Sequence, residues 1–83
     1  MLDREGVTPL YIQLMNLLED NIRKGNLVPG ERLLTEVEMA REYDVSIVTV
    51  RNAIGELIDK GLVERQQGKG TFVTKPKLTK DIR

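Results

Sequence analysis

Two helix-start signals lie close together in the middle of the chain, and they limit what it can fold into. Thr35-Glu36-Val37-Glu38 has the form of a capping box, in which Thr35 and Glu38 satisfy each other's backbone amides. Ser46 is a second residue of the type that caps helices, and it directly follows the break in the helical pattern at Asp44-Val45. With only two or three residues between them, the helices must turn sharply, which predicts a helix-turn-helix.

A longer helix is expected before this pair. Thr8 has the form of an N-cap with Pro9 at the first helical position, where a missing N–H costs nothing, and Gly25 is a natural stop. Val28-Pro29-Gly30-Glu31 fits a type II turn, after which Arg32-Leu33 is expected to form a very short strand. Apolar residues recur at helical spacing and predict an inward face that consists of Leu10, Tyr11, Leu14, Met15, Leu17, Leu18 and Ile22.

A third helix and a hairpin complete the predicted order. The third helix, over 46–60, should end before Gly61, and its inward face is predicted to consist of Val50, Ala53, Ile54, Leu57 and Ile58. The β-prone runs 62–66 and 71–74 surround Gln67-Gly68-Lys69-Gly70, a four-residue loop suited to a hairpin. The predicted fold class is therefore α+β (mainly α): a winged helix-turn-helix with three helices plus a small β-hairpin wing.

Composition excludes most catalytic chemistry. The 83 residues include no His and no Cys, which rules out serine triads, thiol nucleophiles and zinc fingers, so we expect no enzyme, no metal and no cofactor. Glu36 and Glu38 are interpreted as charges at a helix N-terminus rather than as an acid and base pair. The charged start of the chain and apolar runs of at most three residues predict a cytoplasmic protein with no membrane span.

The zero net charge hides an uneven distribution. Residues 1–59 carry 6 basic and 11 acidic side chains, whereas residues 60–83 carry 7 basic and 2 acidic ones. A basic C-terminal third is where an anionic partner would bind, although a solvated polar tail is the alternative. Tyr11, Tyr43 and Phe72 are interpreted as core, because three scattered aromatic residues do not make a stacking platform for single strands.

The predicted fold suits double-stranded DNA. A helix N-terminus carries unpaired amides and a partial positive charge, so Ser46 and Thr49 can lie against phosphate while the first turns of helix 46–60 enter the major groove. The hairpin tip at 67–70 would give a second contact, with Lys69 reaching phosphate or the adjacent minor groove.

Four sequence blocks in the same order resemble one family. They are Pro9-Leu10-Tyr11-Ile12-Gln13, Leu27-Val28-Pro29-Gly30-Glu31-Arg32-Leu33, Val45-Ser46-Ile47-Val48-Thr49-Val50-Arg51 and Gln67-Gly68-Lys69-Gly70-Thr71-Phe72-Val73. Together they resemble the GntR family of bacterial transcription regulators, with a wing most similar to the HutC-type branch. The resemblance implies a domain that binds a palindromic operator as a homodimer. It also implies that residues 75–83 are a linker toward a C-terminal effector domain, not present in this sequence, that senses a small molecule.

The resemblance also implies which residues contact DNA. Arg51 matches a position that contacts guanine or the backbone, whereas Val37 and Ile47 stand where the family commonly has arginine. Ile47 or Val48 could instead pack on a thymine methyl group. The predicted DNA-binding residues are Thr35, Glu36, Ser46, Ile47, Val48, Thr49, Arg51, Asn52, Lys69, Gly70 and Thr71.

Two functions therefore compete. The first is a sequence-specific DNA-binding domain over residues 1–74 of a transcriptional regulator. The second is a winged-helix protein-interaction module that has lost DNA readout, motivated by the apolar residues Val37 and Ile47. Binding to DNA should weaken linearly in the logarithm of the salt concentration, whereas an apolar protein interface should hardly respond.

Overall fold

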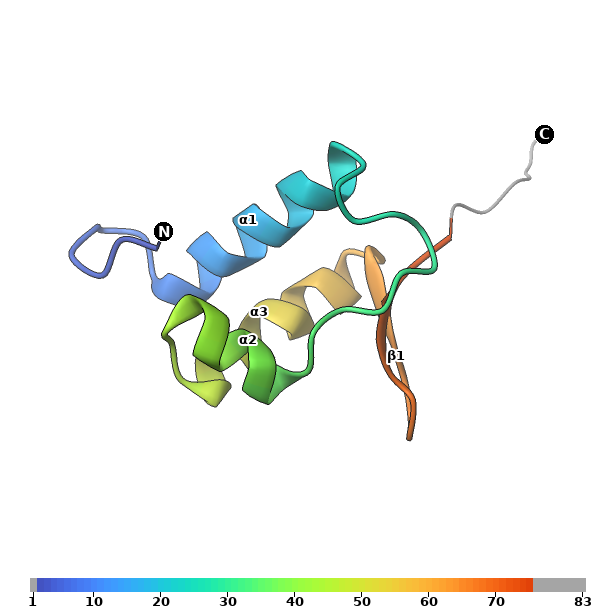
Figure 1. Cartoon of the computed structure of the whole chain (residues 1–83). Helices are drawn as coiled ribbons and strands as arrows, with labels where there is room; N and C mark the ends of the chain where they lie inside the picture. The colour runs from blue at the N-terminus through green and yellow to red at the C-terminus, as the bar shows by residue number, and fades with distance from the viewer. Residues whose placement is uncertain (1, 76–83) are drawn as a thin grey trace.

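Three helices are followed by an antiparallel hairpin in the structure, a computed structural model that describes residues 2–75 (Figure 1). The elements are α1 (Leu10–Arg23), α2 (Glu36–Tyr43), α3 (Ile47–Asp59), β1 (Val63–Gln66) and β2 (Gly70–Val73). The hairpin extends away from the helices, with its turn at the far end (Figure 1). The predicted winged helix-turn-helix, mainly α with a small wing, is confirmed.

Both central helices begin at the predicted caps. The Thr35 hydroxyl accepts a hydrogen bond from the Glu38 amide at 3.1 Å, and the Thr35 amide donates to the Glu38 carboxylate at 2.9 Å. This bond from the Thr35 amide lowers the pKa of Glu38 below its usual range. At the start of α3 the Ser46 hydroxyl accepts from the Thr49 amide at 3.0 Å. Between the helices Asp44 adopts the left-handed conformation, with φ of 54°, and this makes the tight turn.

The start of α1 differs from the prediction. Pro9 itself is the N-cap residue, with ψ of 148°, and no side chain caps the helix, so the predicted cap by Thr8 is wrong. The Pro9 carbonyl already accepts from the amides of Ile12 and Gln13, both at 3.1 Å, which makes Pro9 the boundary residue. The Gln13 side-chain amide donates to the Thr8 carbonyl at 2.7 Å and so holds the segment before the helix.

The core is formed mainly between α1 and α3. Eleven hydrophobic residues are buried: Leu14, Met15, Leu18, Leu33, Met39, Val50, Ala53, Ile54, Leu57, Val63 and Val73. Two residues predicted to face inward, Leu17 and Ile58, are each 36% exposed, so the prediction is wrong for them. Each is next in sequence to a buried leucine, and one residue is a rotation of about 100° about the helix axis, which carries the side chain past the edge of the buried stripe.

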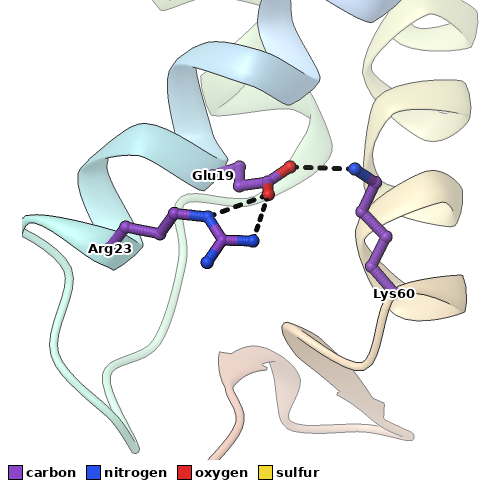
Figure 2. Close-up of polar contacts among 3 residues, drawn as sticks. All are labelled: Glu19, Arg23 and Lys60. Carbon is purple, nitrogen blue, oxygen red and sulfur yellow. Dashed lines mark hydrogen bonds and ion pairs between the residues drawn. The ribbon is translucent and has the colours of Figure 1, made fainter.

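A carboxylate on α1 joins this helix to the end of α3 (Figure 2). Glu19 accepts two hydrogen bonds from Arg23 at 2.6 and 3.0 Å and one from Lys60, the C-cap of α3, at 3.1 Å. The bonds from Arg23 and then Lys60 lower the pKa of Glu19. The C-terminal end of α3 is thus tied to α1 by an ion pair.

The wing contains a third chain segment besides its two strands. Val63 pairs with Val73 and Gln66 with Gly70, so the loop is one residue shorter than predicted, at Gln67–Lys69. The connection between α1 and α2 adds a bridge from Arg32 to Phe72, and the Leu33 amide donates to the Thr71 carbonyl at 2.8 Å. The predicted short strand at Arg32-Leu33 is reduced to an isolated bridge at Arg32. The turn predicted before it is confirmed, with Gly30 at φ of +87° and the Glu31 amide donating to the Val28 carbonyl at 3.0 Å.

Candidate nucleic-acid interface

The outer face of α3 begins with apolar residues. Ile47 is 38% exposed and Val48 is 61% exposed, in the first turn of the helix. Arg51 and Asn52 lie one turn further along the same outer face and are also exposed. The opposite face of the helix is buried in the core, so this outer face is held on a packed element rather than on a loop.

The N-terminus of α3 is free of acidic side chains. No Asp or Glu lies in its first turn, so the partial positive charge of the helix end is not neutralised by the helix itself. The Ser46 hydroxyl caps the Thr49 amide and donates to the Thr49 hydroxyl oxygen at 2.9 Å. Ser46 is exposed and Thr49 is half-buried, so this pair forms a polar edge beside Ile47 and Val48.

Glu36 joins α2, α3 and the wing. Its carboxylate accepts from Arg51 Nε of α3 at 3.0 Å and from an Arg65 guanidinium nitrogen of β1 at 3.4 Å, an arrangement we call the Glu36 cluster. The Glu36 side chain is 26% exposed, whereas Arg51 and Arg65 are 62% and 51% exposed. One carboxylate therefore holds two guanidinium groups from separate elements close together at the surface, leaving much of each cation accessible.

A groove lies between the start of α2 and the wing. Leu34, Thr35 and Glu36 line one side, and Arg65, Gln67 and Thr71 line the other. The groove thus brings four predicted residues, Thr35, Glu36, Gly70 and Thr71, to one place. Gly70 has a backbone φ of +126°, a conformation that L side chains rarely adopt, and this explains why a glycine stands at position 70. The Arg32 side chain lies close beside it, with Nε 2.8 Å from where a Cβ atom would be.

The wing tip is separate from the rest of the site. The Lys69 amide donates to the Gln66 carbonyl at 2.9 Å, which closes the turn, and Lys69 is exposed in the loop between β1 and β2. The structure therefore groups the predicted residues in three places. Thr35, Glu36, Gly70 and Thr71 border the groove; Ser46, Ile47, Val48, Thr49, Arg51 and Asn52 lie along the first half of α3; and Lys69 lies at the tip.

Sequence reasoning missed two cations at this face. Arg65 stands two residues after the buried Val63, and the two-residue period of a strand indicates that both side chains face the helices, so a signal for Arg65 existed. Arg32 had no such signal, because its place depends on the pairing of the α1–α2 connection with β2. Both arginines line the groove.

Two structural features are absent from residues 2–75. Within this range no helix is long and apolar enough to cross a membrane. The same described part of the chain holds no group of three or more metal-ligating side chains.

Comparison with known proteins points to one family. Residues 10–73 match the sequence model of a family described as bacterial regulatory proteins, gntR family. The HTH-type transcriptional regulator YurK of Bacillus subtilis (strain 168) is 49% identical over 82 residues, which cover 99% of this chain and 34% of YurK. The chain thus spans about a third of the length of that curated relative.

Solved structures agree with this match. YtrA from Sulfolobus acidocaldarius, a GntR-family transcription factor, superposes with a TM-score of 0.87 at 31% identity, over 93% of this chain and 81% of YtrA. AraR(DBD) in complex with operator ORE1 superposes with a TM-score of 0.79 at 36% identity, over 89% of this chain and 90% of the AraR chain. Both similarities extend over nearly the whole of the described fold.

Proposed function

We propose that this chain, which belongs to the GntR family of bacterial regulatory proteins, is a sequence-specific double-stranded DNA-binding domain of a transcriptional regulator. One observation carries the proposal: the exposed face of α3 begins at a capped N-terminus without acidic residues and continues into Arg51, beside the wing. The superposition on AraR(DBD), which was solved with its operator, supports this use of the fold. The role is one of binding rather than catalysis, in the cytoplasm of a bacterial cell.

Each part of the site has a task in this proposal. The helix 46–60 lies in the major groove, with the Ser46 and Thr49 end near phosphate and Arg51 near a base edge or the backbone. The tip at 67–70 places Lys69 on phosphate or in the minor groove. Arg65 and Arg32 add positive charge between these two contacts, which lengthens the surface that can follow a DNA backbone.

The proposal extends to the whole regulator. Residues 1–74 form the DNA-binding unit, and 75–83 lead toward a C-terminal domain that binds a small-molecule effector. Residues 76–83 of this segment lie outside the described residues. The complete protein binds a palindromic operator as a homodimer, because two half-sites related by a two-fold axis match two copies of one domain.

A protein-interaction module is the second candidate, and specific side chains favour it. Leu34 and Val37 are 48% and 50% exposed at the start of α2, and Val37 stands where the family commonly has arginine. Such a module would bind a partner protein through this apolar surface and would show little dependence on salt.

A selection and a salt series test the proposal together. The chain is incubated with a pool of random duplexes of about 30 base pairs, bound duplexes are amplified and sequenced, and the affinity for the enriched site is measured by fluorescence anisotropy between about 50 and 300 mM salt. We expect an enriched site whose binding weakens linearly in log salt, and a slope that Lys69→Ala reduces by about 1. Lys24→Ala removes another exposed cation, at the end of α1, and should leave the slope unchanged. A pool without enrichment, or binding without salt dependence, would contradict the proposal.

A further inference from the structure

The first turn of α3 presents the methyl groups of Ile47 and Val48 at its surface, where hydrogen-bond donors would be expected in a helix that binds DNA. Val48 is 61% exposed, so packing inside the domain does not explain it, and Ile47 beside it is 38% exposed. Both are β-branched residues, which are weaker helix formers than Ala, Leu or Lys at an exposed position. A surface that serves only solubility would carry polar residues here.

The nearest polar side chains are engaged with each other or lie further along the helix. The Ser46 hydroxyl donates to the Thr49 hydroxyl oxygen at 2.9 Å and accepts from the Thr49 amide, so the Ser46 group is already paired within the helix start. Arg51 and Asn52 lie one helical turn further on, about 5 Å along the axis, which is a separation of about one to two base pairs in a groove that the helix follows. The base facing the first turn therefore meets the Ile47 and Val48 side chains.

Base chemistry then selects a partner for these methyl groups. In the major groove guanine, adenine and cytosine present donors and acceptors, and an apolar side chain that covered them would leave these groups without partners. Thymine alone among the four bases presents a methyl group, at C5. Building on the proposed function, we infer that Ile47 and Val48 read thymine methyl groups in each half-site, next to the base pair that faces Arg51.

Replacing thymine by deoxyuridine tests this reading, because the change removes the C5 methyl group and keeps all hydrogen-bonding groups. The site enriched from the random pool is synthesised with deoxyuridine at one thymine position at a time, and its affinity for the chain is measured. We expect one or two positions per half-site at which the wild-type chain binds about fourfold more weakly, which corresponds to about 0.8 kcal/mol for one buried CH₂-sized group. Synthetic DNA contains no 5-methylcytosine, so the methyl groups tested are those of thymine.

Val48→Ala connects the effect to the side chain. This variant should bind the thymine site about fourfold more weakly than wild type and should lose little more when the critical thymine is replaced. Lys69→Ala is the matched control: it weakens binding but should keep the full sensitivity to deoxyuridine. Alanine is a good helix former, and Val48 is exposed, so circular dichroism should show an unchanged fold.

The outcomes separate the two claims. An enriched site that binds equally well with deoxyuridine at every position overturns the methyl reading and leaves the proposed function standing. Equal sensitivity to deoxyuridine in Val48→Ala and wild type also overturns the reading by Val48. A pool without any enriched site overturns the proposed function and this inference with it.

Discussion

The helices α2 and α3 begin with the same kind of cap and differ in the charge of their first turns. In both, a hydroxyl side chain accepts a hydrogen bond from the backbone amide three residues later, Thr35 from Glu38 and Ser46 from Thr49. The first turn of α2 contains two acidic residues, Glu36 and Glu38, whereas that of α3 contains none. The N-termini of α2 and α3 thus have the same type of cap but different electrostatic surroundings.

Under the proposed function, this difference separates a start that serves mainly folding from one that serves mainly DNA binding. Carboxylates in the first turn stabilise a helix through its dipole, and α2 has only eight residues, so it needs this support more than a longer helix would. The same carboxylates would repel phosphate. The acidic residues of α2 therefore compensate the partial positive charge at its N-terminus, whereas the N-terminus of α3 is available to an anionic partner.

The largest effect should come from giving α3 the acidic start of α2. Val48→Glu places a carboxylate at the second helical position, where like-charge repulsion of phosphate costs several kcal/mol, so we expect DNA affinity to fall by about 100-fold or more. Thermal stability should stay the same or rise slightly. Val37→Glu makes the same change at the second position of α2, also at an exposed valine, and should cost less affinity, because the first turn of α2 already carries the carboxylates of Glu36 and Glu38. Equal losses of DNA affinity in the two variants would show that the N-terminus of α3 is no more important for DNA binding than that of α2.

Arg51→Ala should have the next largest effect. Loss of an arginine contact to guanine removes about 1–3 kcal/mol of discrimination, so affinity for the enriched site should fall about tenfold or more, while binding to random duplex falls less. Glu36 keeps its ion pair with Arg65, so the fold should be retained. Competition with random duplex measures the change in specificity, and equal losses on both duplexes would show that Arg51 reads no base.

Removing the two side-chain caps should have smaller effects that compare the N-termini of α2 and α3 directly. Thr35→Ala and Ser46→Ala should each lower the free energy of unfolding by about 1 kcal/mol, since each removes one side-chain cap. Ser46→Ala should also weaken DNA binding, by a few fold, because the proposed function places its hydroxyl near phosphate, whereas Thr35→Ala should weaken it less, because Thr35 borders the groove beside the carboxylate of Glu36. Urea unfolding and anisotropy on the same samples check both effects. A comparable loss of affinity in Thr35→Ala would place the start of α2 as close to DNA as the start of α3.

The smallest effect should appear in the acid range. The pKa of Glu38 is lowered in the folded chain from its ordinary value of 4.5, by the bond from the Thr35 amide. Its contribution to stability is therefore complete above pH 4.5 and is lost as the pH falls through the lower folded value. Glu38→Gln should make the stability less dependent on pH in this acid range, measured by urea unfolding in steps of pH.

Local signals made the helices predictable. The capping box, the Ser46 cap and the turn at Gly30 each depend on residues within about four positions of one another, and the structure contains all three. The wrong prediction of Thr8 as N-cap also concerns neighbouring residues. Either Thr8 or Pro9 could be the N-cap, and the hydrogen bonds accepted by the Pro9 carbonyl decide for Pro9. Local reasoning thus identified the elements but placed one of their ends a residue too early.

The site was less predictable where it depends on distant pairs. Glu36 and Arg51 were both predicted to contact DNA, yet their ion pair, across 15 positions, was not expected. Arg65 joins them across 29 positions and was missed. The Glu36–Arg51 contact depends on how α2 packs on α3, and the Arg65 contact depends on the angle at which the wing meets the helices. Both are set by packing in the core rather than by any short stretch of sequence.

The bridge between Arg32 and Phe72 has a consequence for local unfolding of the domain. The backbone of this connection bonds to β2 at Val73 and Thr71, which places the α1–α2 connection inside the wing. A two-stranded hairpin alone is only marginally stable in water. Here β2 cannot separate from its neighbours without also breaking the hydrogen bonds to the connection that leads into α2. The wing and the start of the helix-turn-helix therefore belong to one cooperative unfolding unit, and local opening of either should expose the amides of both to exchange together.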